Sequence, residues 1–188
     1  RLIEVIASLD KVCEQIYIPV QSGSNEILKL MRRGYTVEQY RHLIDLIRSK
    51  IPDIALSTDV IVGFPSESGS QFRKTVELLS DLKYDTVHVA AYSPRPETAS
   101  AREMEDNVPL LEKKRRLSDI EQLQEKIAIV INANLLNETV EVLVERKKKG
   151  KWEGRTRTGK LVFFSDSNDW LGHLVNVIIC KTSPWSLQ

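Results

Sequence analysis

The first hundred residues alternate short apolar runs with amphipathic stretches, which predicts strands separated by helices. The apolar runs 16–20, 54–64 and 86–92 are short and contain several β-branched residues, as buried strands do. Between them, apolar side chains recur at helical spacing in residues 27–31, 40–47 and 72–82. Strands that alternate with helices of about 10–15 residues are typical of βαβ units. We therefore predict an α/β fold with a parallel sheet.

Local signals refine these elements. Thr36 and Gln39 form a capping-box pattern at the start of the first long helix. Pro52 disfavours helical geometry in the residue before it, so this helix should end near Ile51. The Pro-rich segment 93–100 is predicted to be an irregular loop.

The pattern changes in the second half of the chain. A long amphipathic helix is expected from Pro109 to about Asn132, since proline is favourable in a first helical turn. Residues 138–145 then alternate polar and apolar side chains, and further short strands follow with Gly or Asp/Asn turns between them. This spacing predicts a small antiparallel β-barrel. We place one domain at residues 1–122, with the long connecting helix from about residue 109, and the second at residues 123–188.

Composition narrows the classes of protein. The chain is 41% apolar and 28% charged with a formal net charge of +1, so affinity for nucleic acid requires local clustering of charge. No apolar run approaches the roughly 20 residues that span a bilayer, and Arg1 leads directly into an amphipathic stretch rather than a signal peptide. We expect a cytoplasmic protein without membrane contact. Cys13 and Cys180 lie far apart in sequence and are expected to be ordinary packing residues, with no metal site.

Polar residues at the carboxyl ends of the predicted strands are the first candidate site, because ligands of parallel α/β folds bind there. Gln21 and Ser22 follow the first strand, residues 57–59 (Ser-Thr-Asp) interrupt the second, and Tyr92 ends the third. Gly63 directly after the second strand permits a close backbone approach to a ligand or to a neighbouring loop. Asp59 is alternatively a core carboxylate satisfied by a loop, and Gly63 an ordinary turn.

A basic cluster is the second candidate. Residues 145–160 hold eight Lys or Arg, in the predicted barrel and near aromatic side chains, which suits phosphate contacts and base stacking. The alternative is a solvated turn beside core aromatics. The residues expected to bind RNA are Lys147, Lys148, Lys149, Lys151, Arg155, Arg157 and Lys160.

Several segments resemble the radical SAM (S-adenosylmethionine) methylthiotransferases, most closely the MiaB type that modifies tRNA. They are IYIPVQSGSNEILKLMRRGYT, STDVIVGFPSES, AAYSPRPETASA and EGRTRTGKLVFF, and the match runs with little interruption from about residue 14 to residue 186. The last segment resembles the TRAM module, a small RNA-binding β-barrel. The resemblance implies the C-terminal part of a radical SAM partial TIM-type barrel followed by a TRAM-like barrel.

The resemblance also implies roles for single residues. Gln21 and Asp59 fall where radical SAM enzymes contact the SAM ribose, and Arg33 falls where an arginine pairs with the SAM carboxylate, for which its planar fork is suited. The YSPRPET loop would line the side of SAM and substrate. Together with the strand-end residues, the expected cofactor contacts are Gln21, Ser22, Arg33, Ser57, Asp59, Gly63 and Tyr92.

By the same resemblance, the intact enzyme methylthiolates C2 of N6-isopentenyladenosine next to the tRNA anticodon, using SAM and two [4Fe–4S] clusters. The family's CxxxCxxC ligands are expected upstream of Arg1 in missing N-terminal domains of the same polypeptide, so this chain alone should hold no metal, contribute no catalytic residue and be inactive. The partner expected is the anticodon stem-loop of tRNA. The alternatives are a radical SAM methylthiotransferase for ribosomal protein or for another modified adenosine, and a non-catalytic RNA-binding module.

Two positions depart from the family pattern. Ser66 and Glu97 stand where the family has glycine in GFPGE and SPRPGT. If the glycines have positive φ there, the side chains of this sequence are strained.

Overall fold

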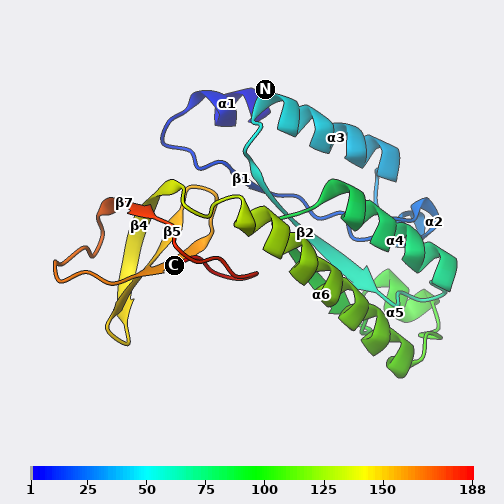
Figure 1. Cartoon of the computed structure of the whole chain (residues 1–188). Coiled ribbons are helices and arrows are strands. Elements are labelled where there is room, and N and C mark those ends of the chain that lie inside the picture. The colour runs from blue at the N-terminus through cyan, green and yellow to red at the C-terminus, as the bar shows by residue number, and fades with distance from the viewer. Residues whose placement is uncertain (1) are drawn as a thin grey trace. The chain divides into compact units, whose positions relative to one another are not determined.

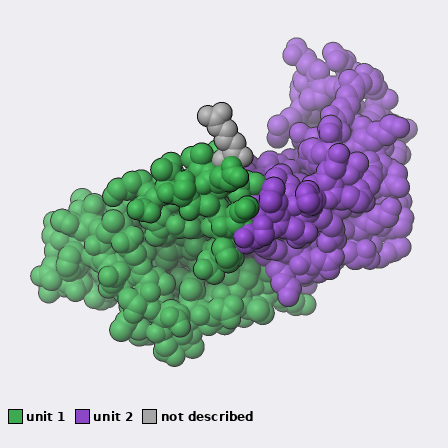
Figure 2. Space-filling model, turned by 90° about the horizontal axis from the view of Figure 1, so that it is seen from above, with its two compact units in different colours: residues 1–16, 50–55, 125–188 green, residues 17–49, 56–124 purple. Residues whose placement is uncertain are grey.

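The computed structural model describes residues 2–188 and divides them into two compact units. One unit contains residues 17–49 and 56–124, and the other contains residues 2–16, 50–55 and 125–188 (Figure 2). The last helix of the first unit continues into the second between residues 124 and 125. The domain boundary at residues 122 and 123 stays a prediction.

The first unit is an α/β structure built around a three-stranded sheet in the order β1-β2-β3, as the alternating pattern predicted (Figure 1). Strands β2 and β3 are parallel, and Gln21 extends β1 alongside Val60 in the same sense. The strands are β1 (Gln15–Tyr17), β2 (Ala55–Val62) and β3 (Thr86–Ala91), and the helices are α2 (Asn25–Leu30), α3 (Val37–Lys50), α4 (Gly69–Leu82), α5 (Ala99–Glu103) and α6 (Leu110–Ala133). The first residues of β1 and β2 and the C-terminal ends of α3 and α6 belong to the second unit.

The two faces of the sheet differ in burial. In β2 the even-numbered residues are buried against the helices, and Thr58 there hydrogen-bonds the Ile18 carbonyl oxygen at 2.8 Å. Tyr40 of α3 donates to the same carbonyl at 2.7 Å. The odd-numbered side chains Ser57, Asp59 and Ile61 are only half-buried. They define what we call the open face of the sheet.

Local capping signals are confirmed. The Thr36 side chain accepts from the Gln39 N–H at 3.3 Å, and the Gln39 side chain accepts from the Thr36 N–H at 2.9 Å. Helix α3 ends at Lys50, as Pro52 required. The prediction that residues 93–100 lack regular structure is wrong at its end, because Thr98 caps α5 by accepting from the Ala101 N–H.

The second unit contains the short helix α1 (Leu2–Ser8) and a curled antiparallel sheet in the order β6-β5-β4-β7, which confirms the predicted β-structure. The strands are β4 (Thr139–Lys148), β5 (Lys151–Thr156), β6 (Leu161–Phe164) and β7 (Leu174–Ile178). Its core is Val142, Val162, Ile179 and Leu187. The β4–β5 turn consists of Lys149 and Gly150, which both have positive φ, so it is shorter than the five-residue turn predicted at KKKGK.

The two cysteines lie at the surface of the second unit. Cys13 and Cys180 are both exposed, so the prediction that they pack in the interior is wrong. Cys13 lies in the loop before β1, and Cys180 lies just after β7, where neither side chain faces a core. Within residues 2–188, no helix has the length and apolar character to cross a membrane.

Candidate functional site

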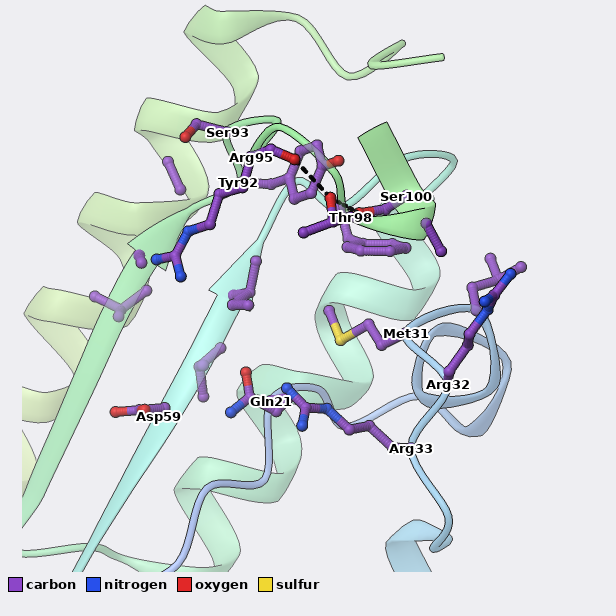
Figure 3. Close-up of a pocket in the computed structure, with 18 of the residues that line it drawn as sticks. Gln21, Met31, Arg32, Arg33, Asp59, Tyr92, Ser93, Arg95, Thr98 and Ser100 are labelled. Atoms are coloured by element: carbon purple, nitrogen blue, oxygen red, sulfur yellow. Dashed lines mark hydrogen bonds between the residues drawn. The ribbon is translucent and has the colours of Figure 1, made fainter. Parts of the chain in front are cut away.

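A cavity of about 570 Å³ lies over the open face of the sheet in the first unit, toward the carboxyl ends of β2 and β3. Its size falls within the range of small-molecule sites. Side chains from both strands and from the loops after β1 and β3 line it (Figure 3). The charged residues among them are Arg32, Arg33, Arg95 and Asp59.

Gln21 and Arg33 meet at one side of this cavity. Gln21 has φ 68°, and its main chain bridges β2 by donating to Asp59 O at 2.8 Å and accepting from Ile61 N at 3.0 Å. The exposed Arg33 side chain points toward the Gln21 amide (Figure 3). The arrangement presents a guanidinium and an amide to an anionic or polar ligand group.

Gly23 explains how the loop after β1 is held, and the sequence reasoning missed it. A Cβ on Gly23 would lie 2.4 Å from the Lys74 carbonyl oxygen of α4. The Gly23 N–H donates to Thr75 Oγ1 at 2.9 Å. Ser22, expected to contact the cofactor, is instead fully buried beside Thr75 and does not line the cavity. Its hydroxyl accepts from the Ser24 N–H at 3.2 Å, so it supports the loop.

Asp59 lies on the open face and has a partner from the neighbouring strand. The Tyr17 hydroxyl donates to an Asp59 carboxylate oxygen, and this hydrogen bond raises the pKa of Tyr17 above its ordinary value. The Asp59 side chain extends from β2 away from Gln21 (Figure 3). Gln21 and Asp59 therefore face different parts of the cavity.

Tyr92 and Phe64 form the wall at the ends of β3 and β2. Their ring centroids lie 5.1 Å apart in an edge-to-face arrangement, and both residues line the cavity. The Tyr92 hydroxyl is buried and has no hydrogen-bond partner among the described residues. A buried hydroxyl at a cavity wall is a donor and acceptor for a ligand.

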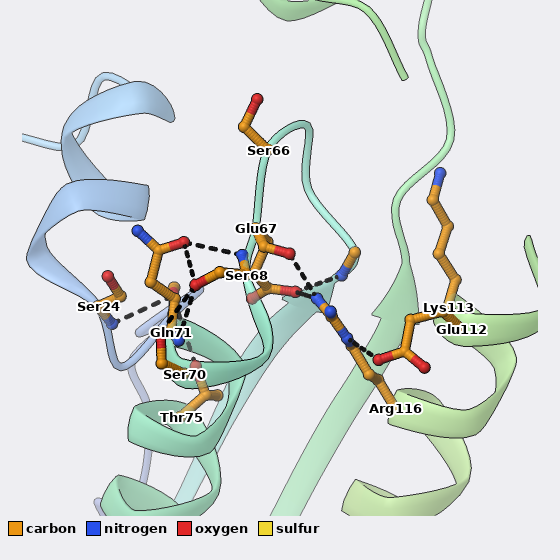
Figure 4. A network of polar contacts seen from close by, with 12 residues as sticks. Ser24, Ser66, Glu67, Ser68, Ser70, Gln71, Thr75, Glu112, Lys113 and Arg116 are labelled. Carbon is orange, nitrogen blue, oxygen red and sulfur yellow. Dashed lines mark hydrogen bonds and ion pairs between the residues drawn. The ribbon is translucent and has the colours of Figure 1, made fainter. Parts of the chain in front are cut away.

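The first turns of α6 hold the loop after β2 in place (Figure 4). Arg116 donates to the Glu67 carboxylate at 2.7 Å and to the Glu67 carbonyl oxygen at 3.0 Å, and both side chains are at least 95% buried. The Glu67 carboxylate also accepts from the Gly63 N–H at 2.7 Å. Burial raises the pKa of Glu67, while the Gly63 N–H and Arg116 oppose that rise.

Lys113 ties the loop after β3 to the same helix. Its side chain is 4% exposed, donates to the Tyr92 carbonyl oxygen at 3.1 Å and pairs with Asp106. Its methylene groups fill the space that a Cβ on Gly63 would occupy, 2.4 Å from Cγ. Gly63 has φ 68° and does not line the cavity. Glycine is therefore required at this position by the backbone conformation and by the packing of Lys113, not by a ligand.

Both departures from the family pattern have positive φ, 66° at Ser66 and 69° at Glu97. Asn107 holds the Ser66 loop by accepting from the Ser66 N–H at 2.8 Å. The strain expected from the sequence is therefore present at both positions.

Of the seven expected cofactor contacts, the structure brings Gln21, Arg33, Asp59 and Tyr92 to one cavity. Ser22, Ser57 and Gly63 do not line it. Ser57 lies on the open face but opposite Thr86, at the far end of the β2–β3 pair from Tyr92. Arg95 and Thr98 line the cavity from the YSPRPET loop, which the resemblance placed beside the ligand. Sequence reasoning missed His88 and Ser100, which line the cavity from β3 and α5.

The basic cluster divides into two groups in the second unit. Lys147, Lys148, Lys149 and Lys151 are exposed around the tip of the β4–β5 hairpin, and the Lys147 ammonium lies 4.5 Å from the centroid of the buried Trp152 ring. These lysines give the hairpin tip an exposed cluster of positive charge.

The remaining basic residues contact the protein itself. Arg157 donates to both carboxylate oxygens of Glu14 at 2.8 Å and to the Val12 carbonyl oxygen at 2.9 Å. The Arg157 hydrogen bonds lower the pKa of Glu14. Arg155 donates to Gly159 O at 3.0 Å, and Lys160 is half-buried. Arg157 thus joins the β5–β6 turn to the segment before β1.

Among residues 2–188, no group of three or more His, Cys, Asp or Glu side chains is placed to hold a metal ion.

Two family models match the chain. Residues 1–79 match the radical SAM superfamily, and residues 134–188 match the TRAM domain.

Relatives align with the whole chain. It is 54% identical over 188 residues to tRNA-2-methylthio-N(6)-dimethylallyladenosine synthase of Dehalococcoides mccartyi, of which it covers 45%. The proteins of the same name from Roseiflexus sp. and Carboxydothermus hydrogenoformans are 53% identical over 191 residues and 44% identical over 190 residues, with 40% and 43% of each covered. The chain therefore spans less than half the length of these relatives.

Proposed function

The chain belongs to the radical SAM methylthiotransferase family and carries a TRAM domain, and on that premise we propose that the intact protein methylthiolates C2 of N6-isopentenyladenosine beside the tRNA anticodon. The observation that carries the proposal is the cavity at the strand ends, where Gln21, Arg33 and Tyr92 offer polar groups to one ligand. The cytoplasm is the compartment we propose for this activity.

The cavity suits S-adenosylmethionine. SAM has a carboxylate, and the Arg33 guanidinium at the cavity would pair with it. The buried Tyr92 hydroxyl, which lacks a partner among the described residues, supplies a hydrogen bond at the wall, and the Gln21 amide supplies another. When bound, SAM and two [4Fe–4S] clusters supply the radical chemistry and the methylthio group.

The role that we propose for the residues of this chain in that reaction is to bind and orient SAM and the substrate. Phe64 and Tyr92 exclude water from one wall, and Lys113 and Arg116 keep the two loops behind that wall in register. We propose that the cluster ligands come from segments of the intact protein outside these 188 residues, since the relatives are more than twice as long.

The β4–β5 hairpin is proposed to hold the tRNA through its phosphates. Each lysine that neutralises a phosphate releases counterions, so binding weakens as salt rises. Lys147, Lys148 and Lys149 are exposed at the tip, whereas Arg157 is engaged by Glu14.

Mass spectrometry of tRNA nucleosides tests the activity. Deletion of the full-length gene should remove 2-methylthio-N6-isopentenyladenosine and accumulate its precursor without the methylthio group, and the wild-type gene should restore the product. An unchanged nucleoside profile would contradict the proposal and direct attention to ribosomal protein as substrate.

Titration of tRNA against the intact protein at rising salt tests the hairpin. Changing Lys147, Lys148 and Lys149 to alanine should weaken binding and reduce the slope of log affinity against log salt by about 1 for each lost contact. Arg157→Ala is the matched control, because it removes a positive charge that is already paired. Equal losses in both variants would exclude the hairpin as the RNA contact.

A further inference from the structure

Tyr17, Asp59 and His88 from three neighbouring strands meet on the open face of the parallel sheet. Asp59 of β2 lies opposite His88 of β3 in the strand register, and the Tyr17 hydroxyl of β1 donates to Asp59. The Tyr17 and His88 ring centroids are 6.3 Å apart with an interplanar angle of 57°. The arrangement places two aromatic rings on either side of one carboxylate.

These side chains are accessible and adjoin the cofactor cavity. Asp59 and His88 line the cavity, His88 is exposed and Tyr17 is 52% exposed. Aromatic rings that are exposed on a sheet face contribute little to the hydrophobic core. A planar ligand can therefore stack on them without displacing a side chain of the protein. The three side chains therefore form a surface for a flat ligand.

Charge separates this surface from the rest of the cavity. Asp59 is the only acidic side chain among the described residues that line the cavity, whereas Arg32, Arg33 and Arg95 are cationic. The arginines favour an anionic group of the ligand near them. The Asp59 carboxylate only accepts hydrogen bonds, so it favours a ligand group that carries an N–H.

We infer that Tyr17, Asp59 and His88 form the subsite for the base of the target nucleotide. The inference rests on the proposed function and deepens it. Because the two rings are tilted by 57°, the base stacks face to face on one of them and meets the other at an angle, and its exocyclic N–H donates to Asp59. Tyr17 is the positioning residue for Asp59, because its hydrogen bond holds the carboxylate while leaving acceptor positions for the base. In this assignment Asp59 serves the substrate base rather than the SAM ribose.

Stacking is tested with an anticodon stem-loop RNA that carries 2-aminopurine at the target position, whose fluorescence falls when the base stacks. The intact wild-type protein should quench it. Tyr17→Ala and His88→Ala should lose most of the quenching and weaken RNA binding by about tenfold, within the range for one base on an aromatic ring. Tyr17→Phe keeps the ring and should keep the quenching. His42→Ala, on α3 and outside the cavity lining, is the matched control and should behave as wild type.

The hydrogen bond is tested with two RNAs that carry adenine or unsubstituted purine at the target position. The wild type should prefer adenine by about tenfold, as expected for a hydrogen bond to a charged acceptor. Asp59→Ala should abolish the preference, whereas a merely structural role of Asp59 would weaken both RNAs equally. Circular dichroism of each variant reports whether it is folded.

The outcomes separate this inference from the proposed function. If the intact wild type yields no methylthiolated nucleoside, the proposed function fails. If it yields the nucleoside while both alanine variants of the rings quench normally, or while Asp59→Ala keeps the adenine preference, only the base subsite is overturned.

Discussion

The buried pair of Arg116 and Glu67 is expected to be the ion pair on which the first unit depends most. Their side chains are 5% and 1% exposed and lie 2.7 Å apart. Arg116→Ala would leave the Glu67 carboxylate buried in the interior. Among the described residues, the Gly63 N–H would be its one remaining hydrogen-bond donor. Removing one partner of a buried pair destabilises by about 3–5 kcal/mol, because the other charge stays desolvated.

A surface pair of the same length provides the control. Arg41 and Asp81 are also 2.7 Å apart, but their side chains are 36% and 59% exposed. Arg41→Ala should therefore change the free energy of unfolding by only about 0.2–1 kcal/mol. Because the two pairs have the same N–O distance, a difference between their losses in the free energy of unfolding would come from burial.

Urea unfolding followed by far-ultraviolet circular dichroism measures both losses, and hydrogen exchange of residues 63–68 shows whether the damage falls on the loop after β2. Adding Glu67→Gln to Arg116→Ala removes the stranded charge and should recover about 0.5–3 kcal/mol. Arg116→Lys serves if the alanine variant does not fold. A loss no larger than that of Arg41→Ala, or no recovery in the double variant, would refute the reasoning.

Three further predictions concern backbone strain, close packing and pH. Glu97→Gly should stabilise the chain by roughly 0.5–1 kcal/mol in a urea titration, because glycine relieves the cost of φ 69° but adds entropy to the unfolded chain, and Glu97→Ala should not. Gly154→Ala should destabilise the second unit by about 1–3 kcal/mol, measured by thermal unfolding of tryptophan fluorescence, since its Cβ would lie 2.3 Å from the Leu143 carbonyl oxygen. Hydrogen bonds from neighbouring arginines lower the pKa of Glu112 from 4.5 to about 2, so the folded state binds fewer protons than the unfolded state between these values. The stability that Glu112 contributes should be full above pH 4.5 and lost as the pH falls toward 2, and Glu112→Gln should flatten that part of the urea midpoint plotted against pH.

Local features of this protein are determined by the sequence itself. The strand and helix order follows from hydrophobic spacing, and the capping box of Thr36 and Gln39 and the stop before Pro52 follow from contacts within a few residues. The family pattern also marked Ser66 and Glu97 as the two positions where a positive φ would strain a residue other than glycine, and both have a positive φ in the structure.

Only the tertiary structure decided which polar residues share a site. Ser22 and Gly63 have the residue types and positions of ligand contacts, yet one supports a loop against α4 and the other packs beneath Lys113. Arg157 belongs to a basic run by sequence, but it pairs with Glu14, 143 positions away. Side-chain spacing along a strand or helix predicts burial within that element, whereas the partner of a charge is set by which distant elements pack together, and a single sequence carries no local signal of that.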